Sequence, residues 1–220
     1  GLICRPRYHD AARVPLPPAR EPACSAVGAC EMGMNHAGER AALSDHVRPH
    51  VALVTTIAPA HIENLGSEEA IADAKAEIFG GLVKGGTAVI PADSPHFARL
   101  KAHADKLDAQ VVSFGRARDA TLRLLDAIPS ANGGSLVTCE YPEGRMCFTV
   151  AEPGEHWITN ALCVMAAVRA AGGDMAAAGL ALAEMGGLKG RGARHQISAP
   201  GGKALLIFVP CLANFLQLVL

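Results

Sequence analysis

The chain of 220 residues predicts an α/β fold: an open, mostly parallel sheet flanked by helices, with a small antiparallel β meander attached. The first observation is that short apolar runs alternate with helical segments, which is typical of βαβ units. The second is a group of three strand-like segments joined only by turn sequences. The third is the composition, half hydrophobic with few aromatic residues, which supplies a sizeable core for a layered protein.

The first half of the chain supplies the parallel strands. Residues 1–23, rich in arginine and proline, show no periodicity and are expected to be irregular. The near-continuous apolar run at 51–57 indicates a strand that is covered on both faces. The expected elements are a strand at 25–32, a helix at 37–46, strands at 51–57 and 87–90, a helix at 95–107 and a strand at 111–114.

The helix expected at 67–83 contains an unusual lysine. Ser67 suits the N-cap, and two glutamates follow in the first turn, where carboxylates complement the helix dipole. Lys75 lies four residues after Ile71 and four before Phe79, inside the apolar stripe of this helix. From periodicity alone, the simpler explanation is that its stem packs on the core while the ammonium group reaches water. The alternative is a functional lysine in a poorly solvated site, where its amine is partly neutral and can react with carbon dioxide to give a carbamate.

The second half carries the meander and the remaining helices. Asn132-Gly133-Gly134 and Pro142-Glu143-Gly144 are turn sequences between the three antiparallel strands. The expected elements are strands at 121–128, 135–141 and 145–150, helices at 157–171 and 175–185, a basic loop at 187–195 and a last strand at 204–209. The final seventeen residues are almost all apolar, but polar residues and Pro210 interrupt them, so we expect a buried strand and no membrane span.

Charge and cysteine usage exclude several classes. The net charge of -1 argues against a nucleic-acid-binding surface. The seven cysteines are scattered, with no C-x-x-C pair, which indicates a reducing compartment rather than a disulfide framework or zinc ribbon. No signal sequence for secretion is visible, so a cytoplasmic protein is expected.

Three polar groups are expected at one edge of the sheet. Ligands bind beyond the carboxyl ends of strands in open α/β sheets. Glu31 ends one strand, His61 follows the next, and Lys75 projects from the helix after it. A carboxylate and an imidazole suit magnesium or manganese, whereas a zinc site would have more His or Cys ligands. Taken alone, a Glu at a strand end is more often a solvated residue, and a His after a strand is mostly structural.

Two further segments suit nucleotide binding. Asn160 lies one turn into a helix that begins near His156, and its amide offers both a donor and an acceptor to an adenine edge. A hydrogen bond at the helix start is an equally good explanation. In the 187–195 loop, Arg191 lies between two glycines and could clamp a phosphate.

These segments together resemble the Mur ligases. The matching motifs are EMGMNHAGE at 31–39, TTIAPAH at 55–61, AKAEIF at 74–79 and Gly-x-His-x-x-x-Asn at 154–160, in family order over roughly residues 14–207. The resemblance is strongest to the member that joins D-alanyl-D-alanine to a UDP-N-acetylmuramoyl-tripeptide. It implies a bacterial, cytoplasmic, ATP-dependent amide ligase of peptidoglycan synthesis, whose partners are small-molecule substrates, and we expect a monomer.

The resemblance also assigns roles to individual residues. It implies that Glu31 and His61 hold magnesium and that Lys75 is carbamylated and helps to bind a second ion. Asn160 would contact adenine, His156 belongs to the same cofactor-binding motif, and Arg191 would contact phosphates. ATP would phosphorylate the terminal carboxylate of the substrate, and the amine would attack the acyl phosphate.

The chain departs from the family at two places. No G-x-x-x-x-G-K-[ST] phosphate-binding loop is present, and GGLVKGGT at 80–87 has suitable residues in the wrong order. After Ile207 the acidic stretch of the family is absent. We therefore expect an irregular N-terminal remnant at 1–23, an incomplete Mur ligase central domain at 24–197 and a truncated or divergent start of the carboxyl-terminal domain at 198–220, with little or no ligase activity.

Two other hypotheses remain open. A metal-dependent hydrolase could use His36, His61 and Glu31, but the H-x-H and H-E-x-x-H patterns of such enzymes are missing. A non-catalytic fragment that exposes the apolar residues 204–220 is compatible with the ligase origin.

Overall fold

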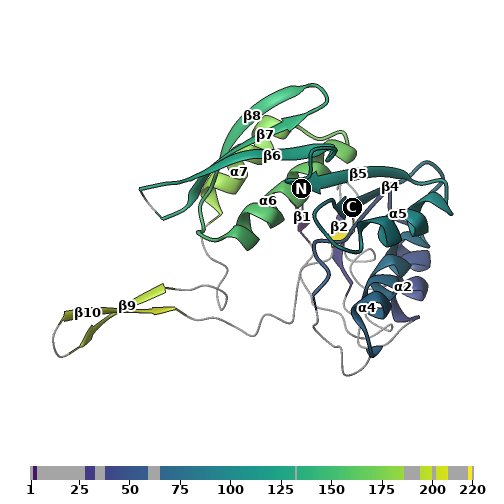
Figure 1. The fold of residues 1–220 in the computed structure, drawn as a ribbon, viewed down its shortest axis with the longest axis horizontal. Coiled ribbons are helices and arrows are strands. Elements are labelled where there is room, and N and C mark those ends of the chain that lie inside the picture. Colours follow the sequence, from purple (N-terminus) through teal and green to yellow (C-terminus); the bar gives the residue numbers. More distant parts are fainter. Residues whose placement is uncertain are drawn as a thin grey trace.

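The computed structural model describes residues 2–3, 28–32, 38–58, 65–131, 133–185, 194–199, 202–207 and 218–219. Nine of the strands form one sheet, in the order β1-β2-β11-β3-β4-β5-β6-β7-β8 (Figure 1). These strands are β1 (Leu2–Ile3), β2 (Gly28–Glu31), β3 (Val51–Leu53), β4 (Thr87–Pro91), β5 (Gln110–Gly115), β6 (Leu122–Pro129), β7 (Ser135–Tyr141), β8 (Gly144–Val150) and β11 (Leu218–Val219).

The sheet is mostly parallel, which confirms the predicted fold class. β3, β4, β5 and β6 pair in parallel, as do β1 and β2. β6, β7 and β8 form the predicted antiparallel meander. β11 pairs antiparallel with both β2 and β3. The pairing of β1 corrects the expectation that the first residues are irregular, because Leu2 and Ile3 extend the edge of the sheet.

Helices cover both faces of the parallel strands. α6 (Glu155–Ala170) and α7 (Met175–Glu184) lie against the meander side, whereas α2 (Glu39–Val47), α4 (Glu68–Ala76) and α5 (Phe97–Asp105) lie at the other side of the molecule (Figure 1). Val89 packs in the core beneath α6, while its neighbours Ala88 and Ile90 pack in the second core beneath α5. This alternation explains why the centre of β4, residues 88–90, is entirely apolar, as a strand buried on both faces requires.

The lysine-bearing helix is shorter than predicted. Its N-cap is confirmed, because the Ser67 hydroxyl accepts a hydrogen bond from the Ala70 N–H at 3.1 Å. The α-helix ends at Ala76 and continues as a single 3₁₀ turn, η1 (Glu77–Phe79). The chain leaves the helix here because the buried Ser44 hydroxyl donates to the Ile78 carbonyl and accepts from the Gly81 N–H. A tertiary contact therefore replaces the next helical turn.

The carboxyl-terminal segment differs from its prediction. β9 (Arg194–Ala199) and β10 (Gly202–Ile207) form a separate antiparallel hairpin, drawn apart from the main sheet in Figure 1. Only one strand, at 204–209, was predicted, because the polar residues of β9 resemble the basic loop that precedes them. Among the described residues, no helix has the length and apolar character needed to cross a bilayer.

Candidate functional site

Lys75 is buried at the carboxyl end of β3. Its side chain is 8% exposed, between the fully buried Ile71 and Phe79. Its Nζ donates a hydrogen bond to the Thr56 carbonyl oxygen at 2.7 Å. Because Thr56 lies three residues beyond the end of β3, the lysine reaches the edge of the sheet where ligands bind in α/β folds. This burial argues against the explanation by snorkelling, since little of the residue is exposed and its Nζ bonds to a backbone carbonyl.

The 74–79 motif, which contains this lysine, contacts the 31–39 motif. Glu77 follows Lys75 by two residues, and both of its carboxylate oxygens accept from the Gly38 N–H, at 2.8 and 2.9 Å. Gly38 is the N-cap of α2 and has a φ of 88°, a conformation that favours glycine. The carboxylate therefore satisfies a backbone donor at the start of α2, where a negative charge also complements the helix dipole. The 74–79 motif thus holds the end of the 31–39 motif in place.

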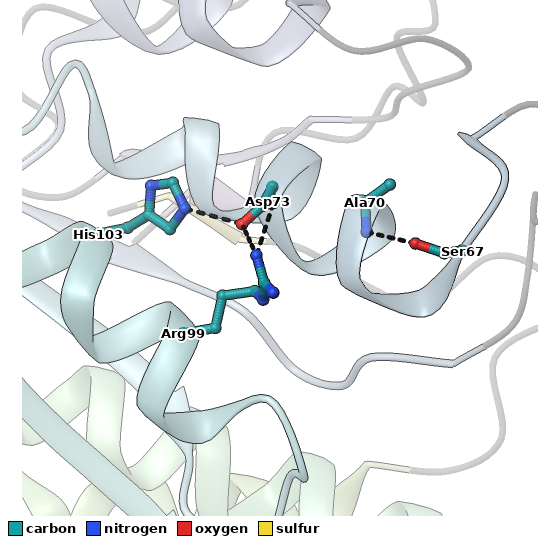
Figure 2. Close-up of polar contacts among 5 residues, drawn as sticks. All are labelled: Ser67, Ala70, Asp73, Arg99 and His103. Atoms are coloured by element: carbon teal, nitrogen blue, oxygen red, sulfur yellow. Dashed lines mark hydrogen bonds and ion pairs between the residues drawn. The ribbon is translucent and has the colours of Figure 1, made fainter.

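Ion pairs fix the helix of Lys75 against α5. Asp73 accepts hydrogen bonds from Arg99 Nη1, at 2.9 and 3.1 Å, and lies 2.9 Å from His103 Nε2 (Figure 2). Partial burial acts to raise the pKa of Asp73, but the hydrogen bonds from His103 and Arg99 outweigh it and hold that pKa below its usual value. One turn earlier, Glu68 lies 3.5 Å from His96. Asp73 is two residues from Lys75, so these contacts restrict how that helix can shift.

A second group of contacts organises the carboxyl ends of β4 and β5. Asp93, just after β4, accepts from the backbone N–H groups of Arg116 and Ala117, each at 2.7 Å. The Arg116 guanidinium in turn lies 2.7 Å from Glu155, the first residue of α6. Gly115 has a φ of 144°, and a Cβ there would lie 2.4 Å from an Asp93 oxygen. The last residue of β5 therefore needs to be glycine, and the loop that follows it links the sheet to the start of α6.

The predicted nucleotide residues lie on α6. His156 is exposed near the start of this helix, with its ring 5.7 Å from that of Trp157. Asn160 is partly buried one turn further along. Within the described part of the chain, its amide makes no hydrogen bond to another residue, so it does not serve the alternative role of bonding the helix start. Among the described residues, therefore, neither the donor nor the acceptor of this amide has a protein partner.

The other predicted site residues lie partly or wholly outside the described structure. Glu31 is the last residue of β2, but its side chain is outside the described part. His61, His36 and Arg191 lie outside the described residues altogether. Among the residues that the structure does describe, no three His, Cys, Asp or Glu side chains are grouped so as to hold a metal ion.

Sequence reasoning missed Asp93 and Asp73. Asp93 lies two residues beyond the end of a strand, close to the edge where Glu31 ends another, and that position alone was a signal for a role at the sheet edge. Asp73 looked like an ordinary exposed helix residue. Only the position of α5 shows that two cationic side chains contact it.

The comparisons with known proteins agree with the fold. Residues 10–168 match the model of the Mur ligase middle domain. The UDP-N-acetylmuramoyl-tripeptide–D-alanyl-D-alanine ligase of Haemophilus influenzae is 31% identical over 161 residues, which cover 73% of this chain and 34% of the relative. The Escherichia coli protein of the same name is 32% identical, over 73% of this chain and 35% of the relative. A UDP-N-acetylmuramate–L-alanine ligase from Kineococcus radiotolerans is 35% identical, over 65% and 30%.

A solved structure gives the same assignment. MurF from Acinetobacter baumannii superposes with a TM-score of 0.70 at 25% identity, over 80% of this chain and 38% of that one. The fold is also that of MurF from Thermotoga maritima in complex with ADP, with a TM-score of 0.62 at 20% identity, over 74% and 37%. The chain spans about a third of the length of the curated relatives it matches.

Proposed function

Because the chain belongs to the Mur ligase family, we propose that it supplies the central, ATP-binding part of an amide ligase of peptidoglycan precursor synthesis. The proposed reaction joins D-alanyl-D-alanine to a UDP-N-acetylmuramoyl-tripeptide. Two of the matched relatives carry this activity in their names, while a third is named for adding L-alanine. The proposed location is the bacterial cytoplasm, and the proposed oligomeric state is a monomer.

The proposed chemistry proceeds in two steps. The terminal carboxylate of the peptide attacks the γ-phosphorus of ATP, which forms an acyl phosphate and releases ADP. The amine of D-alanyl-D-alanine then attacks the acyl carbon, loses a proton, and displaces inorganic phosphate as the amide bond forms. Both steps need the nucleotide and the carboxylate to be held in line at the edge of the sheet.

The burial of Lys75 at the carboxyl end of β3 carries this proposal. In the proposed site, the Nζ of Lys75 combines with carbon dioxide and loses a proton to give a carbamate. A carbamate supplies anionic oxygen at a buried position, which suits a hard divalent cation. Glu31 and His61 would hold one magnesium ion, and the carbamylated Lys75 would help to hold a second. Bound magnesium would neutralise charge on the phosphoryl oxygens.

The nucleotide is proposed to bind between the edge of the sheet and α6. Asn160, with its amide free of protein partners within the described part of the chain, would contact adenine. His156 would lie beside it as part of the same motif, and Arg191 would contact the phosphates. The loop after β5 sets the position of α6 through the contact between Arg116 and Glu155, so it would position this nucleotide site.

We propose that the chain of 220 residues by itself turns over little or no substrate. Its printed sequence has no phosphate-binding loop, so the triphosphate lacks the backbone N–H groups and the lysine that usually anchor it. The division into 1–23, 24–197 and 198–220 remains a prediction. A non-catalytic chain is the second candidate, and the departures after Ile207 favour it.

One set of measurements separates these ideas. Thermal unfolding should shift upward with ATP and magnesium together, and the shift should be smaller in Lys75→Ala and Asn160→Ala. Lys84→Gln, which changes an exposed lysine away from the site, serves as the control. Absence of any nucleotide-dependent shift would refute the nucleotide site. Phosphate release that depends on the tripeptide precursor and D-alanyl-D-alanine would instead refute the proposed inactivity. Aggregation that rises with concentration on sizing would support the non-catalytic chain.

A further inference from the structure

An arginine-lined pocket lies on the meander, away from the proposed ligase site. The pocket has a volume of about 550 Å³ and lies between the loop after β5 and the turn from β7 to β8. Arg118, Arg123 and Arg145 line it, together with Glu140 and the backbone of the turn. We call these three arginines and Glu140 the arginine pocket.

The strand register places most of this pocket on one face of the meander. Glu140 on β7 is paired with Arg123 on β6 and with Arg145 on β8, so the three side chains form a row across the strands. Val137 and Cys139, which alternate with Glu140, are buried in the core beneath α6 and α7. Because successive residues of a strand point to opposite faces, the row faces away from those helices. Asn160 lies on α6, so the arginine pocket is separate from the proposed nucleotide site.

Two guanidinium groups share a single carboxylate in this row. Glu140 accepts from Arg145 Nε at 2.9 Å, and Arg123 Nη1 is 3.9 Å from its other oxygen. Arg118 makes no hydrogen bond or ion pair to any residue in the described part of the chain. The other carboxylate that lines the pocket, Glu143, is already engaged by Arg169. The pocket therefore carries an excess of positive charge.

The geometry of Arg123 points to a ligand. Its Nε is buried, yet it has no hydrogen-bond partner among the described residues. A buried N–H without a partner is unfavourable, so the surrounding residues leave this guanidinium incompletely satisfied. Arg123 lines the pocket with a side chain that is 37% exposed, so an anion there would accept bonds from its terminal nitrogens together with bonds from the neighbouring guanidinium groups. Guanidinium forks match phosphate oxygens well, and a phosphoryl group offers three oxygens where a carboxylate offers two.

We propose that the arginine pocket binds the phosphoryl group of a small phosphorylated molecule. Arg118 donates to its oxygens from the loop side and Arg123 from the strand side. Arg145, at the end of the row, adds positive charge while it remains paired with Glu140. This site does not depend on the proposed ligase activity, because none of its residues belongs to that machinery.

The test is a titration of the full chain of 220 residues with inorganic phosphate, at constant ionic strength. The readout is the ¹H–¹⁵N resonance of the Arg123 side-chain Nε–H, which reports on this pocket alone. We expect a saturable shift with phosphate and little shift with acetate. Arg118→Gln should weaken phosphate binding about tenfold, the effect of losing one charge-assisted hydrogen bond. Lys84→Gln removes the same charge from an exposed residue elsewhere and should leave the affinity unchanged.

Three results would overturn the proposal. The first is an Arg123 resonance that does not respond to phosphate. The second is an equal response to acetate, which would indicate a general carboxylate site or simple charge screening. The third is an equal loss of affinity in Arg118→Gln and Lys84→Gln. Arg118 has no partner in the described structure, so its replacement should leave the thermal transition in place. Arg145→Gln, at a side chain that is 68% exposed, provides a second variant with the same expected loss.

Discussion

Replacing Ser44 with alanine tests how the helix of Lys75 is held in place. The Ser44 side chain is fully buried on α2, and its hydroxyl bonds to two backbone groups, the Ile78 carbonyl and the Gly81 N–H. Ser44→Ala removes both bonds while it retains the Cβ, so the packing hardly changes. Each buried backbone group left without a partner costs about 1–3 kcal/mol. We therefore expect the free energy of unfolding to fall by about 2–4 kcal/mol.

Urea denaturation at neutral pH, followed by circular dichroism, measures this change. Ser94→Ala is the matched control, because Ser94 is only partly buried and its hydroxyl accepts a single local bond, from the His96 N–H at 3.2 Å. The control should lose no more than about 1 kcal/mol. Hydrogen exchange at the Gly81 amide should accelerate in Ser44→Ala and stay unchanged in the control. A loss below about 0.5 kcal/mol, with Gly81 still protected, would refute the role of Ser44 in ending the helix.

Three further predictions follow from single contacts. Asp73→Asn should lower the free energy of unfolding by about 0.5–1 kcal/mol at pH 7, since its exposed ion pairs are screened by solvent. The depressed pKa of Asp73 means that this stabilisation is present above the unfolded pKa and lost as the pH falls through the folded pKa, so wild type and variant should converge in acid. Gly115→Ala should cost about 2 kcal/mol or more, because its φ of 144° and the adjacent Asp93 carboxylate leave no room for a Cβ; an unchanged melting temperature would contradict this. The exposed thiol of Cys147 should react with maleimide in the folded protein. Burial raises the pKa of the Cys139 thiol to about 11, so Cys139 should react only when the protein unfolds. Peptide mapping by mass spectrometry would identify which cysteine is labelled.

The structural predictions were accurate where the local sequence pattern and the burial pattern coincided. Lys75 interrupts an apolar stripe, and the structure confirms that it is buried at the carboxyl end of a strand. The order of the motifs was enough to predict the family. The predicted length of the Lys75 helix was wrong. The apolar periodicity continues through residues 77–83, but the backbone leaves the helix where the Gly81 N–H bonds to the Ser44 hydroxyl. The β9–β10 hairpin was missed because its first strand has a polar sequence.

The sequence by itself determined the alternation of strands and helices, the N-cap at Ser67 and the burial of both faces of β3, since each depends on neighbours within a few residues. Tertiary structure alone decided the contacts of Glu77 with Gly38, of Asp73 with Arg99 and His103, and of Glu140 with Arg123. These pairs lie between 17 and 39 residues apart in the chain. Periodicity specifies which face of an element is apolar, but the polar partner of a side chain depends on how two elements are docked. Lys75 could therefore be identified as a candidate from the sequence, whereas the arginine pocket could be identified only from the strand register of the meander.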